Sequence, residues 1–397
     1  MGEGVRAAFG LAGGLALFLF GMENMSRALQ QAAGERMRGF LRRVTRTPLT
    51  GALAGLLVTA VLQSSSATTV MVIGFVSAGL MELPQAVAVV FGANVGTTMT
   101  AQLVAFRLAD WVFPILFAGV LVWLLARRER TRQLGLAVFS FGLLFDGIEV
   151  LSGAMAPLAE HPVFLRWMTQ VRHTPLLGLL LGTGMTLVVQ SSSATIAVLQ
   201  RAAQQAGPDG IHSVLGLAGA LPILLGDNIG TTITAVLAAV GQPTDARRTA
   251  AAHCCFNLSG SVVCLLALPW MTRLVEAVSP KGPELEVLAR QIANAHTTFN
   301  VVCTLIWLPL LPVMVKIVTF LIKGNDRAEE AAYKPKFLDE HVISQPVAAM
   351  CLVSKEITGL SDTAKEMLAS LNAYVAKKEP EAAYEKFVSS HGAVKRL

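Results

Sequence analysis

The sequence predicts an all-α polytopic membrane protein built from two inverted-topology repeats, each with a re-entrant helical hairpin and a broken transmembrane helix. Three observations lead to this fold class. The chain of 397 residues is very apolar, with 53% hydrophobic residues, only 15% charged residues and a mean hydropathy of +0.58. Two polar motifs each occur twice in the same order, and short basic clusters separate the apolar stretches.

Several apolar stretches are long enough, or nearly so, to cross a hydrocarbon core of about 30 Å. Examples are residues 9–22, 111–126, 134–151 and 301–320. The first stretch has no cleavage site of small residues, so we expect a retained helix rather than a signal peptide. The five cysteines show no CxxC pairing and indicate neither disulfides nor a zinc site. The net charge of +6 comes from clusters between apolar segments, which indicates membrane topology rather than nucleic-acid binding.

An internal duplication organises the chain. A Thr-Pro-Leu segment leads into Gln63-Ser64-Ser65-Ser66, and the same pattern recurs before Gln190-Ser191-Ser192-Ser193. A second motif, Gly-x-Asn-x-Gly-Thr-Thr-x-Thr, follows at residues 92–100 and again at residues 226–234. Two polar motifs that recur in the same order are not explained by chance similarity between apolar helices. We therefore divide the chain into a first repeat at 1–132, a second repeat with an additional transmembrane helix at 133–323, and a tail at 324–397.

The basic clusters predict how the two repeats are oriented. Arginines at 27–46 and at 127–132 assign two loops to the cytoplasm. The 14 residues from Leu49 to Leu62 span only about 21 Å as a helix, too little to cross, so we expect a re-entrant hairpin. Following the chain onward, the second hairpin enters from the opposite side and Arg247 and Arg248 return to the cytoplasm. The second repeat is therefore predicted to be upside down, with the soluble helical tail on the cytoplasmic side.

The two motifs place polar groups in apolar surroundings, where each unpaired group is costly. Serine hydroxyls that bond back to their own helix offer one explanation, but a duplicated block that includes glutamine favours a ligand site. In the second motif, two glycines and an asparagine are expected to interrupt a helix, after which the threonines begin the next half-helix. Matching breaks in two halves indicate a transport site, although a glycine hinge without ligand is the alternative.

A broken helix offers N–H groups that attract an anion and free carbonyl groups that coordinate a small cation. Phosphate together with sodium fits this pairing. Between residues 49 and 106 the only charged residue is Glu82, so no basic residue of that segment neutralises an anion. Cations bound together with the anion would have to do so.

These paired motifs resemble the type II sodium-phosphate cotransporters, over about residues 5 to 320. Two further segments, at 252–257 and 295–300, are similar to the family's AHxxFN pattern, although none follows the first Gly-x-Asn motif. The tail is similar to the start of a PhoU-like helical domain. The resemblance implies phosphate binding by Gln63, Ser64, Ser65, Ser66, Gln190, Ser191, Ser192 and Ser193, to which we add Asn94 and Asn228. It implies sodium sites at Gln190, Ser191, Thr231 and Thr234 and, by symmetry, at Gln63, Thr97 and Thr100, to which we add Asp227.

The resemblance further implies a secondary active transporter that works by alternating access, without a cofactor, with sodium as co-substrate. We expect a multi-pass protein of the bacterial inner membrane that binds lipid but no nucleic acid, and a homo-oligomer is left open. His253 and His296 suit a structural role better than a metal site or proton relay. A channel and a regulator without transport are the competing functions. An enzyme is disfavoured because the duplicated serines have no nearby base in their motif.

Overall fold

The computed structural model describes residues 3–45, 47–77, 80–106, 108–159, 162–207, 209–324, 357–359, 361–362 and 364–372. These residues form helices and turns, with one isolated β-bridge between Ala206 and Ser213. The chain divides into two compact units, Met1–Lys323 and Gly324–Leu397. In the second unit residues 364–372 are helical, whereas most of the predicted PhoU-like tail lies outside the described residues.

Five helical segments of the first unit are long and apolar enough to cross a membrane. They are Val5–Ala32 within α1 (Glu3–Val44), α4 (Leu83–Val104), Glu129–Met155 within α6 (Glu129–Ala159), Gly216–Ala238, and α12 (Thr244–Leu266). The bent pair α14 (Glu284–Trp307) and α15 (Leu311–Leu321) is a sixth candidate. The prediction of an all-helical protein with several membrane spans is therefore confirmed.

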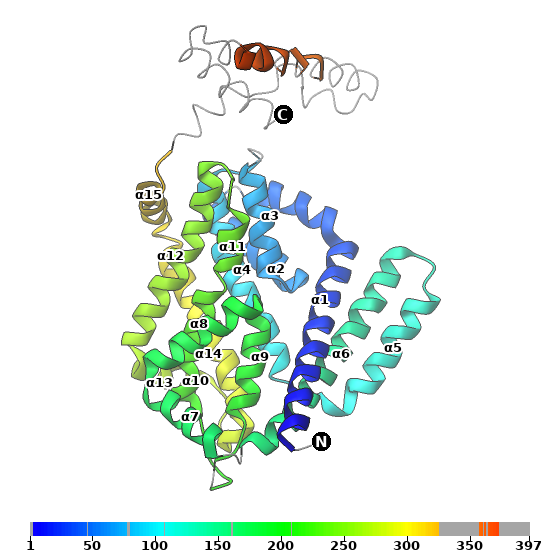
Figure 1. Cartoon of the computed structure of the whole chain (residues 1–397), viewed down its shortest axis with the longest axis vertical. Helices are drawn as coiled ribbons and strands as arrows, with labels where there is room; N and C mark the ends of the chain where they lie inside the picture. Colours follow the sequence, from blue (N-terminus) through cyan, green and yellow to red (C-terminus); the bar gives the residue numbers. More distant parts are fainter. Residues whose placement is uncertain are drawn as a thin grey trace. The chain divides into compact units, whose positions relative to one another are not determined.

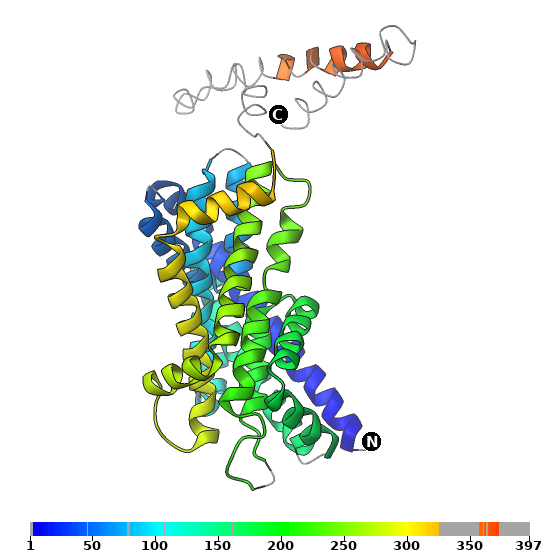
Figure 2. The same ribbon diagram turned by 90° about the vertical axis from the view of Figure 1, so that its left-hand side faces the viewer.

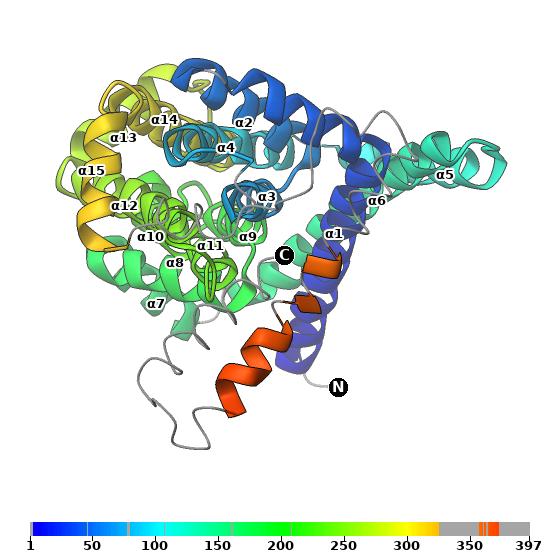
Figure 3. The same ribbon diagram turned by 90° about the horizontal axis from the view of Figure 1, so that it is seen from above.

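The helices α1 and α6, which begin the two repeats, pack against each other in antiparallel directions (Figure 1). Gly10 lies against Ala154, whereas Gly21, farther along α1, lies against Leu144, so positions that rise along one helix fall along the other. A short apolar helix, α5 (Val112–Leu125), covers α6 from outside, and Figure 3 shows it at the edge of the unit. One apolar cluster, which includes Phe18 and Ile148, joins α1 to α6.

Each repeat then contains two short helices joined by a sharp turn, followed by a helix that carries the Gly-x-Asn motif. The short pairs are α2 (Pro48–Leu62) with α3 (Ser65–Ser77), and α8 (Pro175–Val189) with α9 (Ser192–Ala203). Both α2 and α8 begin with a Thr-Pro pair and have 15 residues. At about 1.5 Å per residue they are shorter than a hydrocarbon core.

The motif glycines bring two helices into close contact in both repeats. A Cβ atom on Gly92 of α4 would lie 1.7 Å from the carbonyl oxygen of Ala52 in α2. At the corresponding place in the second repeat, a Cβ on Gly226 would lie 2.0 Å from the carbonyl oxygen of Leu179 in α8. Only glycine allows helix backbones to approach this closely, as in other small-residue contacts between membrane helices.

This contact corrects the prediction of a broken transmembrane helix. The motif at residues 92–100 lies inside α4, which is continuous from Leu83 to Val104. In the second repeat, α10 (Gly216–Gly230) is separated from α11 (Ile233–Ala238) by only Thr231 and Thr232, and Gly216–Ala238 still qualifies as one span. The prediction was wrong for the first repeat because glycine suits close packing as well as a break, and packing decides its conformation here.

The last spans form a second internal repeat. In α12 followed by α13 (Leu268–Val278), and in α14 followed by α15, the sequences AHxxFN and Leu-Pro-x-Met recur in the same order. The angle between α14 and α15 is 87°, and Figure 2 shows α15 lying across one end of the unit. The apolar stretch at 301–320 is therefore divided between two helices. Pro309 lies in the break between α14 and α15, where a helix would lose a hydrogen bond and meet the proline ring.

Most basic connections point toward one end of the unit. The C-terminal end of α1, the α5–α6 connection and the α11–α12 connection all lie toward the end that carries α15 (Figures 1 and 2). The side chains of residues 33–44 and of Arg46 lie outside the described part of the structure.

The two repeats pack against each other. Residues of α3, in the first repeat, share an apolar cluster with Ala235 of α11 and Ala246 of α12, in the second.

Candidate functional site

The two Gln-Ser-Ser-Ser motifs form the turns between the paired short helices. Gln63 and Gln190 both have φ of 54°, and they are the only described residues other than glycine in the left-handed region. Each backbone N–H donates to a threonine carbonyl 2.7 Å away, Thr59 in one repeat and Thr186 in the other. A side chain in this conformation costs on the order of 1 kcal/mol, and such outliers gather at functional sites.

The serine after each glutamine caps the following helix. Ser64 Oγ accepts a hydrogen bond from the Ala67 N–H, and Ser191 Oγ accepts one from the Ala194 N–H. Each turn therefore presents the N-terminus of a helix, with partial positive charge, beside serine hydroxyls. Such helix ends bind anions, phosphate included.

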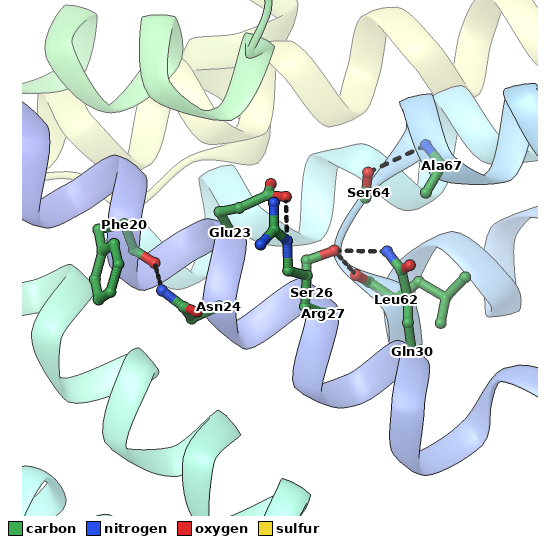
Figure 4. Close-up of polar contacts among 9 residues, drawn as sticks. All are labelled: Phe20, Glu23, Asn24, Ser26, Arg27, Gln30, Leu62, Ser64 and Ala67. Atoms are coloured by element: carbon green, nitrogen blue, oxygen red, sulfur yellow. Dashed lines mark hydrogen bonds and ion pairs between the residues drawn. The ribbon is translucent and has the colours of Figure 1, made fainter.

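The two turns are held by neighbouring polar contacts. Across the first turn, Thr59 Oγ1 donates to Thr68 Oγ1 at 2.9 Å, and its counterparts Thr186 and Thr195 lie 3.0 Å apart. The leading helix α1 contacts both turns: Ser26 Oγ donates to the carbonyl oxygen of Leu62 at 2.9 Å (Figure 4), and Ser191 Oγ donates to Met22 Sδ at 3.7 Å. The counterpart of Ser26 in α6 bonds within its own helix instead.

The acidic residue of α1 near the first turn, Glu23, forms an ion pair within its own helix. Glu23 pairs with Arg27 at 2.8 Å, and both side chains are exposed. Figure 4 shows this ion pair on α1, one helical turn before the Ser26 contact. It leaves Glu23 as a surface group of this helix.

Several predicted ligand residues meet in the structure. Gln63 Oε1 accepts a hydrogen bond from Thr100 at 3.0 Å, which joins two members of the predicted first sodium set. Ser66 Oγ lies 3.3 Å from Thr234 Oγ1, so the first turn contacts the second motif from the other repeat. The side chains of Gln63, Ser66 and Thr234 are half-buried. Polar groups of both repeats are thus adjacent inside the helical unit.

Other predicted ligands have no such contact. Among the described residues, no hydrogen bond links Gln190 or Ser191 to Thr231 or Thr234. Gln190 is exposed, whereas Ser65, Ser192 and Ser193 are buried or half-buried near the turns. The hydroxyls of Thr97 and Thr231 donate to carbonyls four residues earlier in their helices, which leaves their lone pairs available to a cation. Their roles stay predictions.

The motif asparagines bond to the two histidines. Asn94 Oδ1 lies 3.0 Å from His253 Nε2, and Asn228 Oδ1 lies 3.2 Å from His296 Nε2. All four side chains are at most 5% exposed. Because each asparagine Nδ2 donates to a carbonyl of its own helix, the Oδ1 atom must accept from the histidine. The two histidines therefore connect α12 to α4 and α14 to α10.

The structure also shows polar contacts of residues that the sequence analysis did not select as candidates. Arg290, from α14, donates to Oε1 of Gln102 at 2.8 Å and lies 4.2 Å from the centre of the Phe106 ring. A distant part of the chain thus brings a basic side chain to the C-terminal end of α4. No sequence signal marked it, whereas Thr59 and Thr186 could have been found because they recur in the duplicated segment.

Together these features define a multi-pass membrane protein in which two repeats carry the same strained polar turn beside the same close helix pair. The family described as Na+/Pi-cotransporter matches residues 17–153 and, a second time, residues 147–279. The chain therefore belongs to the Na+/Pi-cotransporter family, and the resemblance inferred from the paired motifs is confirmed.

Individual relatives carry different names. The uncharacterized protein YqeW of Bacillus subtilis is 35% identical over 263 residues, 66% of this chain and 83% of the relative. The putative inorganic phosphate export protein YjbB of Escherichia coli K12 is 29% identical over 366 residues, 91% of this chain and 64% of the relative. The sodium-dependent phosphate transport protein 2A of Rattus norvegicus is 34% identical over 116 residues, 28% of this chain and 18% of the relative. No solved structure matches the chain significantly.

Proposed function

We propose that this protein is a secondary active transporter that couples sodium flux to the movement of inorganic phosphate by alternating access. The observation that carries the proposal is the pair of left-handed glutamine turns, Gln63 and Gln190, each followed by a serine-capped helix. Backbone strain repeated at both turns of a transporter family member is best explained by a ligand that both turns bind. Family membership and the relatives' names support phosphate as that ligand.

Phosphate would bind between the two helix N-termini, through serine hydroxyls and backbone N–H groups. The side-chain contact between Ser66 and Thr234 supports one shared site, because it joins the first turn to the second motif. Asn94 and Asn228 remain in the proposed set, with one N–H of each amide free to donate after their bonds to carbonyl and histidine. A doubly charged anion held by neutral donors in low dielectric needs counter-charge.

Sodium would supply that counter-charge. The side-chain oxygens of Gln63, Thr97 and Thr100 and those of Gln190, Ser191, Thr231 and Thr234 are the hard neutral ligands that small cations accept. The Thr100–Gln63 contact at 3.0 Å supports the first set. In the second set, Asp227 adds a formal negative charge. Sodium is then a co-substrate, and the proposal includes no cofactor.

Alternating access requires two halves that can exchange roles. We propose that α2–α3 and α8–α9 are re-entrant hairpins entering from opposite sides, because α2 and α8 are too short to cross. The antiparallel contact of α1 with α6 supports inverted repeats. The basic connections at one end support a cytoplasmic assignment of that end, with the tail on the same side, in a bacterial inner membrane.

The proposal is tested with purified protein in liposomes. An imposed sodium gradient should drive labelled phosphate above its equilibrium concentration, and the direction should reverse when the gradient is reversed. Replacing sodium with choline should abolish accumulation. Phosphate equilibration without accumulation would indicate a channel, and no flux under any gradient would indicate a regulator; either result contradicts the proposal. Reversing the gradient also addresses the relative named as an exporter, since the ion gradient sets the direction of a symporter.

A further inference from the structure

One fully buried carboxyl group lies beside the second turn. Asp227 of α10 is 0% exposed. Its Oδ1 atom accepts a hydrogen bond from Thr186 Oγ1 in α8 at 2.6 Å. Its Oδ2 atom is buried and has no hydrogen-bond partner among the described residues, and no basic side chain of that part lies within 4 Å.

Asp227 lies at the end of a short line of oxygen atoms. Thr186 Oγ1 is 3.0 Å from Thr195 Oγ1, and Thr195 in turn donates to the carbonyl oxygen of Ser191 at 3.3 Å. Thr186 has one proton, which the 2.6 Å contact assigns to the carboxylate as a charge-assisted bond. Oxygen atoms alone therefore connect the carbonyl group of Ser191, in the strained turn, through Thr195 and Thr186 to the carboxylate of Asp227.

A carboxylate without a partner is costly in this position. Burial of an isolated charge costs far more than a single hydrogen bond returns, so such a group is paired, protonated or bound to a cation. A proton on Oδ1 could be donated to Thr186, and Thr186 could then donate to Thr195, but Oδ2 would stay buried without a hydrogen-bond partner among the described residues. A small cation would instead satisfy Oδ2 and neutralise the charge, and carboxylate, hydroxyl and carbonyl oxygens are the ligands that hard cations take.

We infer that Asp227, Thr186 and Thr195 form a sodium site that exists in the second repeat only. It rests on the proposed sodium coupling and adds Thr186 and Thr195 to the residues that carry it. The first repeat has the same threonine pair, Thr59 and Thr68, 2.9 Å apart. Its residue at the position of Asp227 is Ala93.

The structural equivalence of these two positions is direct. A Cβ on Gly182 would lie 3.0 Å from the Asp227 nitrogen, and a Cβ on Gly55 would lie 3.1 Å from the Ala93 nitrogen. The helix pair around the two positions is therefore packed in the same way. The carboxylate is what distinguishes the second repeat, and it restricts the site to that repeat.

Two substitutions of one threonine provide the central comparison. Thr186→Val removes a ligand, whereas Thr186→Ser keeps the hydroxyl beside the carboxylate. At saturating phosphate, Thr186→Val should raise the sodium concentration for half-maximal uptake about tenfold or more, as loss of a charged hydrogen bond implies. Thr186→Ser should leave that concentration within about twofold of wild type. Equal sodium dependence in the two variants would overturn the assignment.

A second measurement does not depend on transport. Sodium that binds only the folded protein raises the midpoint of thermal unfolding. The shift from choline to sodium, measured in detergent without phosphate, should be as large in Thr186→Ser as in wild type and smaller in Asp227→Asn, a neutral isostere, because only the first sodium set would remain. An equal shift in Asp227→Asn would overturn the site. Absence of sodium-driven uptake in wild type would instead contradict the proposed function, whereas this shift would still decide the site.

Discussion

Gly92→Ala tests whether the close contact between α2 and α4 holds the first turn in place. The added Cβ would lie 1.7 Å from the Ala52 carbonyl oxygen, where ordinary contacts begin at 3.4 Å. Neither atom is the end of a flexible side chain, so the helices must separate by about 1.5 Å. We expect the free energy of unfolding to fall by about 3 kcal/mol, at the upper end of overpacking costs.

The same separation should affect function. Thr100 of α4 donates to Gln63 at the end of α2 over 3.0 Å, and a displacement of about 1.5 Å would break that bond. Gly74→Ala is the matched control, because a Cβ there meets no atom within 4 Å and alanine favours a helix. In Gly92→Ala, but not in Gly74→Ala, the midpoint of thermal unfolding in detergent and the rate of sodium-driven phosphate uptake should both be lower than in wild type. Equal midpoints and equal uptake in the two variants would refute this explanation of the glycine.

Five further variants test the turns and His253. Gln190→Gly should raise the free energy of unfolding by up to about 1 kcal/mol, because it relieves the left-handed strain at an exposed side chain, yet lower sodium-driven uptake; lower stability would contradict it. Ser65→Ala and Ser192→Ala should each weaken phosphate binding by about 1 to 3 kcal/mol in calorimetric titrations, and unchanged affinity in both would remove these serines from the site. His253→Leu should slow phosphate uptake and His253→Gln, which keeps a donor for Asn94, should restore it; equal rates would make the hydrogen bond irrelevant.

The features predicted best from sequence are those whose physical cause is local. A glutamine followed by three serines between two apolar stretches, present twice, leaves the backbone few ways to satisfy its polar groups. The turns at residues 63 and 190 accordingly lie where the motifs indicated. The helical class and the number of apolar stretches likewise follow from composition and length, which set how much of the chain can lie in a bilayer.

The errors come from residues with two physical uses. Gly92 and Gly96 suit a helix break and a close helix contact equally well, and only the neighbouring helix α2 decides between them. Pro309 shows the converse, since apolar composition at 301–320 suggested one helix, but the proline divides it. Arg290 could not be placed at all, because its contact with Gln102 joins positions 188 residues apart.

The two repeats are alike where backbone geometry is concerned and differ where charge is concerned. The glycine contacts, the left-handed glutamines and the threonine pairs recur with nearly the same dimensions, as the proposed exchange of equivalent conformations would require. Asp227, by contrast, stands opposite Ala93. In the proposed alternating-access cycle, a charge present in one repeat alone would give a cation different affinities in the two conformations, and such a difference allows an ion to shift their equilibrium. Symmetry of the backbone would then supply the motion, and asymmetry of charge would supply its coupling to sodium.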